Sequence, residues 1–168
     1  MEIIVAQPLT RENFAPFGDV IDTGGEIHYP INDGKCERYH ALARAEAGGP
    51  NGHVIINLFK ATPYAFPLPL SMVERHPFGS QAFVPLTQRP FLVVVAPDGS
   101  DGPGTPRAFV TAPGQGVNYR RNLWHGVLTP ISEPQDFVVV DRGGDGSNLE
   151  EFYFSNPYEI HLPDGFSS

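Results

Sequence analysis

Cysteine and long apolar runs are the first things that this sequence lacks. Cys36 is the single cysteine, so no disulfide can form within the chain. No stretch approaches the roughly 20 apolar residues that a membrane-spanning helix needs. The opening segment MEIIVAQPLTREN also has no basic region followed by an apolar run, as a targeting signal would have. These absences predict a cytoplasmic protein without a membrane partner.

Basic residues are also scarce. Lys and Arg number 11 against 19 Asp and Glu, which gives a formal charge of -8. Because the phosphates of nucleic acids attract basic surfaces, this balance argues against a nucleic-acid partner and fits a soluble cytoplasmic protein. The chain has 168 residues and shows no break in composition, so residues 1–168 are predicted to form a single domain.

Extended helical periodicity is absent, whereas Gly and Pro, at 18 residues each, are abundant. They separate short apolar or alternating runs, which is typical of short strands joined by turns. These runs predict strands at residues 53–61, 70–75, 81–86, 91–96, 107–111, 116–120, 124–128, 137–141 and 158–162. Because parallel strands would require crossover helices, the pattern indicates an all-β antiparallel sandwich or barrel.

Two shorter segments complete the predicted fold. A short N-terminal helix is expected near Leu9–Phe14, with Thr10 as its N-cap and with Pro16 and Gly18 beyond its end. The segment 97–104 is rich in Gly, Pro and Asp, residues that favour turns. It is therefore predicted to be a connecting loop or the tip of a hairpin.

Two polar clusters stand among these runs. Glu74 and His76 lie two residues apart next to a predicted strand, so their side chains are expected on the same face. Trp124 and His125 follow a Gly- and Pro-rich turn. Taken alone, each cluster is more often structural, because charged residues are mostly exposed and Trp is mostly part of a core.

The two clusters together resemble the cupin layout. In cupins, a first motif holds H-x-H and a later Glu, and a second motif rich in Gly and Pro ends in a further His. On this sequence Glu74 stands at the first His, His76 at the second, Gln81 at the carboxylate and His125 at the last His. The resemblance implies a double-stranded β-barrel, or jelly-roll, of the cupin type.

Longer strings narrow this resemblance to one family. The strings MVERHPFGSQAFVPL, PFLVVVA, PGQGVNYRRNLWH and LTRENFAPFGDVI are similar to ureidoglycolate lyases of allantoin degradation, over nearly the whole chain. The resemblance implies a homodimeric, cytoplasmic enzyme of purine metabolism that eliminates urea from (S)-ureidoglycolate to give glyoxylate. It implies catalytic roles for Glu74, His76 and His125, and substrate-binding roles for Ser80, Gln81, Asn118, Tyr119, Arg120 and Trp124.

These residue types suit an elimination. The reaction needs a base for the substrate hydroxyl and an acid for the departing nitrogen, and Glu and His commonly fill such roles. We expect His76 or His125 to be the base, with Glu74 orienting or tuning a histidine. Which group gives the proton and which takes it stays open at this point.

Substrate recognition calls for other residue types. Arg75 is expected on the strand face opposite Glu74, so Arg120 or Arg121 is the better candidate to bind the substrate carboxylate. The urea group has both donors and acceptors, which match the side chains of Asn118, Gln81, Ser80 and Tyr119.

A divalent metal is the one cofactor that the sequence suggests. If a metal is bound, its predicted ligands are Glu74, His76, Gln81 and His125. Two His and one carboxylate hold iron in many oxygenases, and a divalent ion would also polarise the substrate hydroxyl. The usual cupin set has three His and one Glu, so the departure weakens this expectation. Nickel is the ion that the family resemblance implies.

Three other functions stay open on the sequence alone. A metal-dependent cupin oxygenase would use Glu74, His76 and His125, and metal content with oxygen consumption would identify it. A non-catalytic cupin would only bind a small molecule, since one fold hosts many functions. A related hydrolase would release ammonia and carbon dioxide in place of urea, which a product assay distinguishes.

Overall fold

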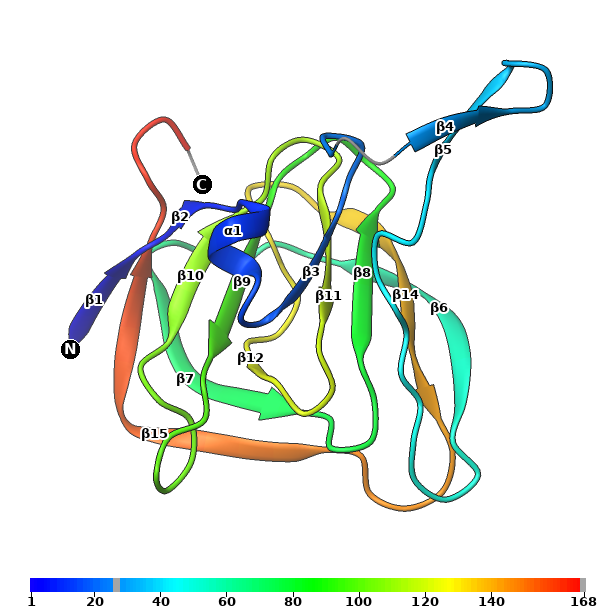
Figure 1. The fold of residues 1–168 in the computed structure, drawn as a ribbon. Helices are drawn as coiled ribbons and strands as arrows, with labels where there is room; N and C mark the ends of the chain where they lie inside the picture. The colour runs from blue at the N-terminus through cyan, green and yellow to red at the C-terminus, as the bar shows by residue number, and fades with distance from the viewer. Residues whose placement is uncertain (26–27, 167–168) are drawn as a thin grey trace.

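Strands dominate the structure, a computed structural model that describes residues 1–25 and 28–166 (Figure 1). Residues 26–27 and 167–168 of the predicted 1–168 domain lie outside the described residues. The elements are β1 (Glu2–Val5), β2 (Gln7–Pro8), α1 (Arg11–Phe14), β3 (Gly18–Ile21), β4 (His28–Ile31), β5 (Cys36–Tyr39), β6 (His53–Ala61), β7 (Leu68–Arg75), β8 (Gln81–Pro85), β9 (Phe91–Ala96), β10 (Arg107–Val110), β11 (Gly116–Tyr119), β12 (Trp124–His125), β13 (Thr129–Pro130), β14 (Gln135–Gly143) and β15 (Glu150–His161).

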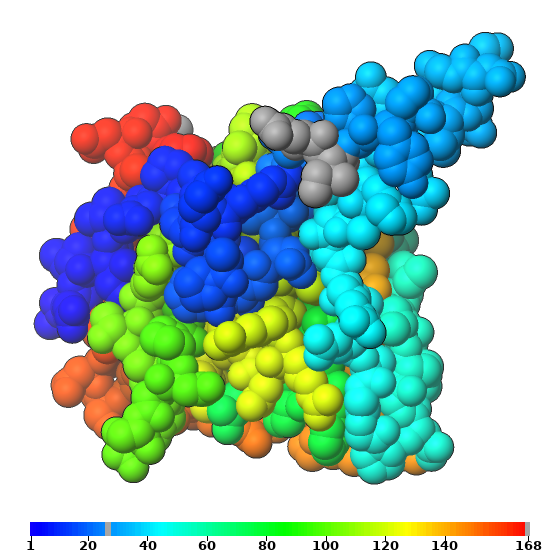
Figure 2. All heavy atoms as spheres, viewed as in Figure 1, coloured from blue at the N-terminus to red at the C-terminus, as the bar shows by residue number. Residues whose placement is uncertain are grey.

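Two large sheets form the body of the molecule. The eight-stranded sheet has the order β1-β15-β7-β12-β9-β10-β2, with β13 paired to β9, and the five-stranded sheet has the order β3-β11-β8-β14-β6. Strands β4 and β5 form a separate hairpin that projects from the rest of the molecule (Figure 1 and Figure 2). The nearly closed, barrel-like arrangement confirms the predicted all-β fold of the cupin type.

Strand direction agrees with the prediction for most of the molecule. Ten of the twelve strand pairs among the described residues are antiparallel. Strand β1 pairs with β15 and β2 pairs with β10 in parallel. The prediction that parallel pairing would require crossover helices is wrong for these two pairs, because each joins strands far apart in the sequence and other strands form the connection.

Two apolar cores lie on opposite faces of β9. Phe91, Val93 and Val95 belong to the first core, which joins β9 and β10 to the five-stranded sheet. Leu92 and Val94 belong to the second, which draws on β7, β9, β10, β12 and β15 of the eight-stranded sheet. A strand that is buried on both faces has a continuous apolar sequence, which explains the run FLVVVA.

The short N-terminal helix begins and ends as predicted. Thr10 caps α1: its hydroxyl accepts a hydrogen bond from the backbone N–H of Asn13 at 3.1 Å, and the Asn13 side chain accepts one from the Thr10 N–H at 2.9 Å. The helix ends at Phe14, two residues before Pro16, and the Phe14 ring lies in the first core. Within residues 1–25 and 28–166, no helix has the length and apolar character needed to cross a membrane.

The predicted strands are found with small shifts in their ends. Strands β6 and β9 have the predicted bounds, β8, β10 and β11 end one residue early, and β12 keeps only Trp124–His125. The predicted loop at 97–104 is a hairpin tip between β9 and β10, in which the Gly99 N–H donates to the Gly102 carbonyl at 2.6 Å. The sequence did not predict β1 to β5, β13 or the first part of β15.

Candidate active site

Three side chains from β7, β12 and the residue that follows β7 meet beside Tyr119 of the first core. Glu74 and His125 are direct partners in the antiparallel pairing of β7 with β12, so their side chains lie on the same face. His76 follows the end of β7. One ligand atom from each of Glu74, His76 and His125 lies within 4.8 Å of the other two. We call these three residues the triad.

Backbone carbonyl groups orient both histidines of the triad. The Nδ1 atom of His76 lies 2.9 Å from the Asn148 carbonyl oxygen, and Nδ1 of His125 lies 2.9 Å from the Gly126 carbonyl oxygen. Because a carbonyl only accepts, each Nδ1 carries a hydrogen. The Nε2 atoms of both rings are therefore the ones that face the centre of the triad, the arrangement that histidines adopt when they ligate metals.

His125 is buried and uncharged. Among the described residues its Nε2 atom has no hydrogen-bond partner. Burial lowers the pKa of His125 to about 3, and the nearby His76 adds to the decrease, although the bond to the Gly126 carbonyl opposes it. At neutral pH His125 therefore presents a free lone pair at Nε2, but its low pKa makes it a poor base.

Glu74 and Tyr119 complete the polar surroundings of the histidines. Burial raises the pKa of Glu74; Glu151 raises it further, whereas His76, whose Nε2 lies 3.9 Å from Glu74 Oε1, lowers it. The Tyr119 ring stacks on His125, with 4.5 Å between ring centroids. Burial and the charge of Glu74 raise the pKa of Tyr119, so its hydroxyl keeps its proton.

Gln81 also reaches the triad. Its Oε1 atom lies 3.1 Å from His76 Nε2, and its Nε2 donates to a carboxylate oxygen of Asp141 at 3.2 Å. Gln81 is opposite Tyr119 in the pairing of β8 with β11, which places both side chains on the inner face of the five-stranded sheet. The structure thus brings five of the predicted site residues together: Glu74, His76, Gln81, Tyr119 and His125.

Four other predicted binding residues point elsewhere. The Ser80 hydroxyl accepts from the Glu46 N–H at 2.7 Å. Asn118 donates to the Arg44 carbonyl and the Asp19 carboxylate, on the outer face of β11. The alternation of side chains along β11 explains the position of Asn118, since Tyr119 points inward and its neighbours in the sequence point outward. Arg120 is exposed, and Trp124 lies in the second core. The structure therefore gives no support for binding at the triad by these four residues: Ser80, Asn118, Arg120 and Trp124.

Arg75 lies on the face opposite Glu74, as the strand pattern predicted. Its guanidinium group lies 4.2 Å from the centroid of the Trp124 ring and donates to Glu150. Arg121, the other candidate for the substrate carboxylate, donates from Nε to the Pro77 carbonyl at 2.7 Å. Both cations already have partners in the protein.

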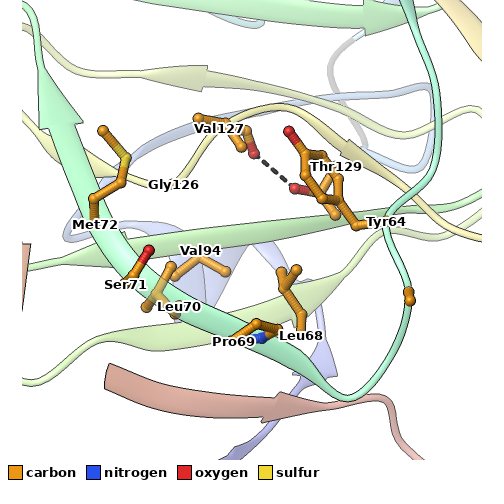
Figure 3. Close-up of a pocket in the computed structure, with 11 residues that line it drawn as sticks. Tyr64, Leu68, Pro69, Leu70, Ser71, Met72, Val94, Gly126, Val127 and Thr129 are labelled. Carbon is orange, nitrogen blue, oxygen red and sulfur yellow. Dashed lines mark hydrogen bonds between the residues drawn. The ribbon is translucent and has the colours of Figure 1, made fainter. Parts of the chain in front are cut away.

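A separate apolar groove lies beside β7 (Figure 3). It has a volume of about 470 Å³, and none of the eleven described residues that line it is charged. Leu68, Leu70 and Met72 of β7 face it, opposite Val127 and Tyr64 (Figure 3). Among its described residues the groove has no Asp, Glu or His side chain for proton transfer, so the triad is the better candidate site.

The triad fits a divalent metal ion. The imidazoles of His76 and His125, the second with an unpartnered Nε2 atom, and the carboxylate of Glu74 form a donor set that first-row metals accept. The buried Nε2 of His125, which has no partner among the described residues, is the kind of atom that a ligand would satisfy. Glu74, His76 and His125 would hold the ion, and the Gln81 carbonyl oxygen is close enough to His76 to join them.

An all-β barrel that carries two histidines and a carboxylate on adjoining strands defines a cupin-type enzyme site. The family model described as ureidoglycolate lyase matches residues 1–161. The chain is 73% identical to "Ureidoglycolate lyase" from Mesorhizobium japonicum, over 97% of this chain and all of that one. It is 62% identical to the protein of that name from Chelativorans, over 98% of this chain and 99% of the relative.

A third relative, "Ureidoglycolate lyase 2" from Rhizobium meliloti, is 58% identical over 92% of this chain and 94% of its own length. Identity this high over nearly full length, together with the family model, shows the family. The chain belongs to the ureidoglycolate lyase family, as the strings around the triad predicted.

The sequence did not reveal four residues that support the triad. Asn148 and Gly126 act through their backbone carbonyls, which no side-chain pattern can show. Asp141 and Asn57 join Gln81 in a hydrogen-bonded chain. Each is a polar residue at an inward position of a predicted apolar strand, and that signal would have found them.

Proposed function

We propose that this protein is a ureidoglycolate lyase, which eliminates urea from ureidoglycolate and leaves glyoxylate. The full-length match to the family supports the reaction. The observation that carries the assignment of the site is the convergence of Glu74, His76 and His125 within 4.8 Å.

Glu74 is the residue that we assign to proton transfer. The net reaction moves the hydroxyl proton of the substrate to the nitrogen of the departing urea. Glu74 takes the hydroxyl proton, the C–N bond breaks with its electron pair on nitrogen, and the proton passes to that nitrogen as the C–O bond becomes a carbonyl. A raised pKa suits a carboxylate that must both take and return a proton.

The other residues of the site hold the reactants. His125 is no longer the preferred base, because burial keeps its pKa at about 3. His76 lies 3.9 Å from Glu74 and orients that carboxylate. Tyr119, which keeps its proton, and Gln81, which presents a carbonyl oxygen, supply one donor and one acceptor for the hydroxyl, carboxylate and urea groups of the substrate.

A divalent ion, nickel by family likeness, is part of this proposal. Its donors are Glu74, His76, His125 and Gln81, and when bound it would polarise the substrate hydroxyl. Glu74 has two carboxylate oxygens, so holding an ion with one leaves the other able to accept a proton.

We also propose that the enzyme is a cytoplasmic homodimer. Strand β6 is an edge of the five-stranded sheet, with Val54, Ile56 and Leu58 exposed in a row. An edge strand with unpaired backbone groups and an apolar face favours pairing with a second copy about a two-fold axis. Sedimentation analysis of the purified protein tests this assembly.

Product analysis tests the proposed reaction. Purified protein is incubated with each enantiomer of ureidoglycolate, and glyoxylate, urea and ammonia are measured before and after treatment with a chelator. We expect equal amounts of glyoxylate and urea from the (S) enantiomer, without ammonia. Release of ammonia and carbon dioxide would identify the hydrolase, and unreacted substrate would contradict the proposal.

A further inference from the structure

A chain of side-chain hydrogen bonds crosses three neighbouring strands of the five-stranded sheet and ends at the triad. The strands are β6, β14 and β8. Asn57 of β6 donates to Oδ1 of Asp141 on β14 at 3.0 Å, and Gln81 of β8 donates to Oδ2 of Asp141 at 3.2 Å. The other end of the Gln81 amide, Oε1, lies 3.1 Å from Nε2 of His76.

Asp141 determines which way the amide of Gln81 faces. An ionised carboxylate can only accept hydrogen bonds, so the NH₂ group of Gln81 must face Asp141. The carbonyl oxygen then faces His76 and the triad. Without Asp141, the amide would be free to turn its NH₂ group toward the triad, where it offers neither an acceptor for substrate nor an oxygen ligand for a cation.

We propose that Asp141 is a positioning residue, which holds the Gln81 carbonyl oxygen toward the triad, and that Asn57 holds Asp141 in place. The proposed role in catalysis rests on the proposed function, because Gln81 acts there as an acceptor. Asn57 completes the arrangement, since its NH₂ group donates to Oδ1 of Asp141 and leaves Oδ2 to accept from Gln81.

The surroundings of Asp141 favour this role over simple packing. Its neighbours on the inner face of the sheet, Val139 and Phe137, are fully buried apolar residues. Within residues 1–25 and 28–166, no cation lies within ion-pair distance of Asp141; its side-chain partners are the two neutral amides of Asn57 and Gln81. A half-buried carboxylate costs free energy that an apolar residue at this position would avoid.

The proposal is tested by exchanging the amide of Asn57 and the carboxylate of Asp141 between the two positions, one step at a time. In Asp141→Asn, the new amide faces two NH₂ groups and can accept from only one of them well. We expect kcat/KM to fall about 10- to 100-fold, as for other outer partners of active-site ligands. In the double variant Asn57→Asp/Asp141→Asn, the carboxylate at position 57 accepts from the amide at position 141, whose carbonyl oxygen again accepts from Gln81. Activity should recover to within about threefold of the wild type.

A matched control comes from the same strand end. Asn51 and Asp145 form an exposed side-chain pair of the same kind, and neither side chain is hydrogen-bonded to Gln81 or to the triad. Asp145→Asn makes the same chemical change there and should leave kcat/KM unchanged. The proposal is overturned if Asp141→Asn has wild-type activity, or if the double variant folds with the wild-type midpoint of unfolding yet stays as impaired as the single variant.

A second measurement does not depend on lyase activity. Hydrogen exchange of the Gln81 side-chain NH₂ group, followed by ¹⁵N NMR, should be slow in the wild type because that group is buried and bonded to Asp141. Exchange should quicken in Asp141→Asn and slow again in the double variant. If the three proteins show these exchange rates but the wild type releases no glyoxylate, the proposed function fails and the positioning role of Asp141 holds. Equal exchange in all three proteins would refute the positioning role.

Discussion

The two faces of β7 and β12 differ in the kinds of side chain that they bring together. On the inner face, Glu74 and His125 stand side by side, and the Nε2 atom of His125 has no partner among the described residues. On the outer face, one residue away on each strand, Arg75 lies over the Trp124 ring and binds Glu150. The same backbone thus carries the proposed catalytic pair on one side and a cation stacked on an aromatic ring on the other.

The difference separates two proposed roles. Arg75 has partners within the protein, which is typical of a group that serves the fold. His125 is held at Nδ1 and left open at Nε2, next to the carboxylate of Glu74, which supports the proposed role in the reaction. Substitutions on the inner face should therefore change activity, and substitutions on the outer face should change stability.

The largest expected effect is that of Glu74→Gln. The amide keeps the shape of the side chain but cannot take up the hydroxyl proton, so kcat should fall about 10²- to 10⁴-fold. The free energy of unfolding should stay the same or rise, since a half-buried carboxylate is removed. Glyoxylate release and urea denaturation measure the two quantities. Wild-type turnover by this variant would remove Glu74 from the mechanism.

His125 should link stability to pH in chelator-treated protein. Its pKa is about 3 in the folded state and about 6.5 in the unfolded state. Because only the unfolded chain binds the proton in this window, stability is fully present above pH ~6.5 and is lost as pH falls toward 3, by up to about 1.4 kcal/mol per pH unit. Urea denaturation at several pH values should show a shallower slope for His125→Gln than for the wild type. Equal slopes would contradict the neutral, buried state of His125.

Tyr119→Phe tests one donor on the inner face. The ring and its stacking on His125 remain, and only the hydroxyl is removed. Loss of a single hydrogen bond to the substrate should lower kcat/KM about tenfold, while the unfolding midpoint stays the same. Steady-state kinetics on glyoxylate release provides the measurement. If activity is unchanged, Tyr119 serves packing alone.

Arg75→Ala is the smallest predicted change and the counterpart on the outer face. It removes the cation over Trp124 and the partly exposed ion pairs with Glu150 and Asp98, and should cost about 1 kcal/mol of stability. Turnover should stay within about twofold of the wild type. A large loss of activity without a loss of stability would show that the two faces are not separate.

Sequence patterns predicted the parts of the molecule that depend on local spacing. The alternation of strands placed Glu74 and Arg75 on opposite faces, and the capping pattern placed α1 after Thr10. Strands that depend on distant partners were missed, such as β1, which pairs with the end of β15. Such pairing is decided by tertiary packing, which leaves little signal in a four-residue segment.

The same limit explains why the predicted site residues do not all lie together. A shared sequence motif does not show which face of a strand each side chain lies on. Asn118 and Trp124 were therefore grouped with their neighbours Tyr119 and His125, although the alternation of side chains places them on the opposite face. Asp141 lies 60 residues beyond Gln81 in the sequence. Only the order of strands β8-β14-β6 brings these two side chains together.

The most direct test of the triad is a crystal structure of the Glu74→Gln variant with ureidoglycolate bound. The account predicts that the substrate hydroxyl lies at hydrogen-bond distance from the side chain at position 74, with His76, His125 and Tyr119 around the same carbon. A substrate molecule bound in the apolar groove beside β7, or outside both large sheets, would contradict it.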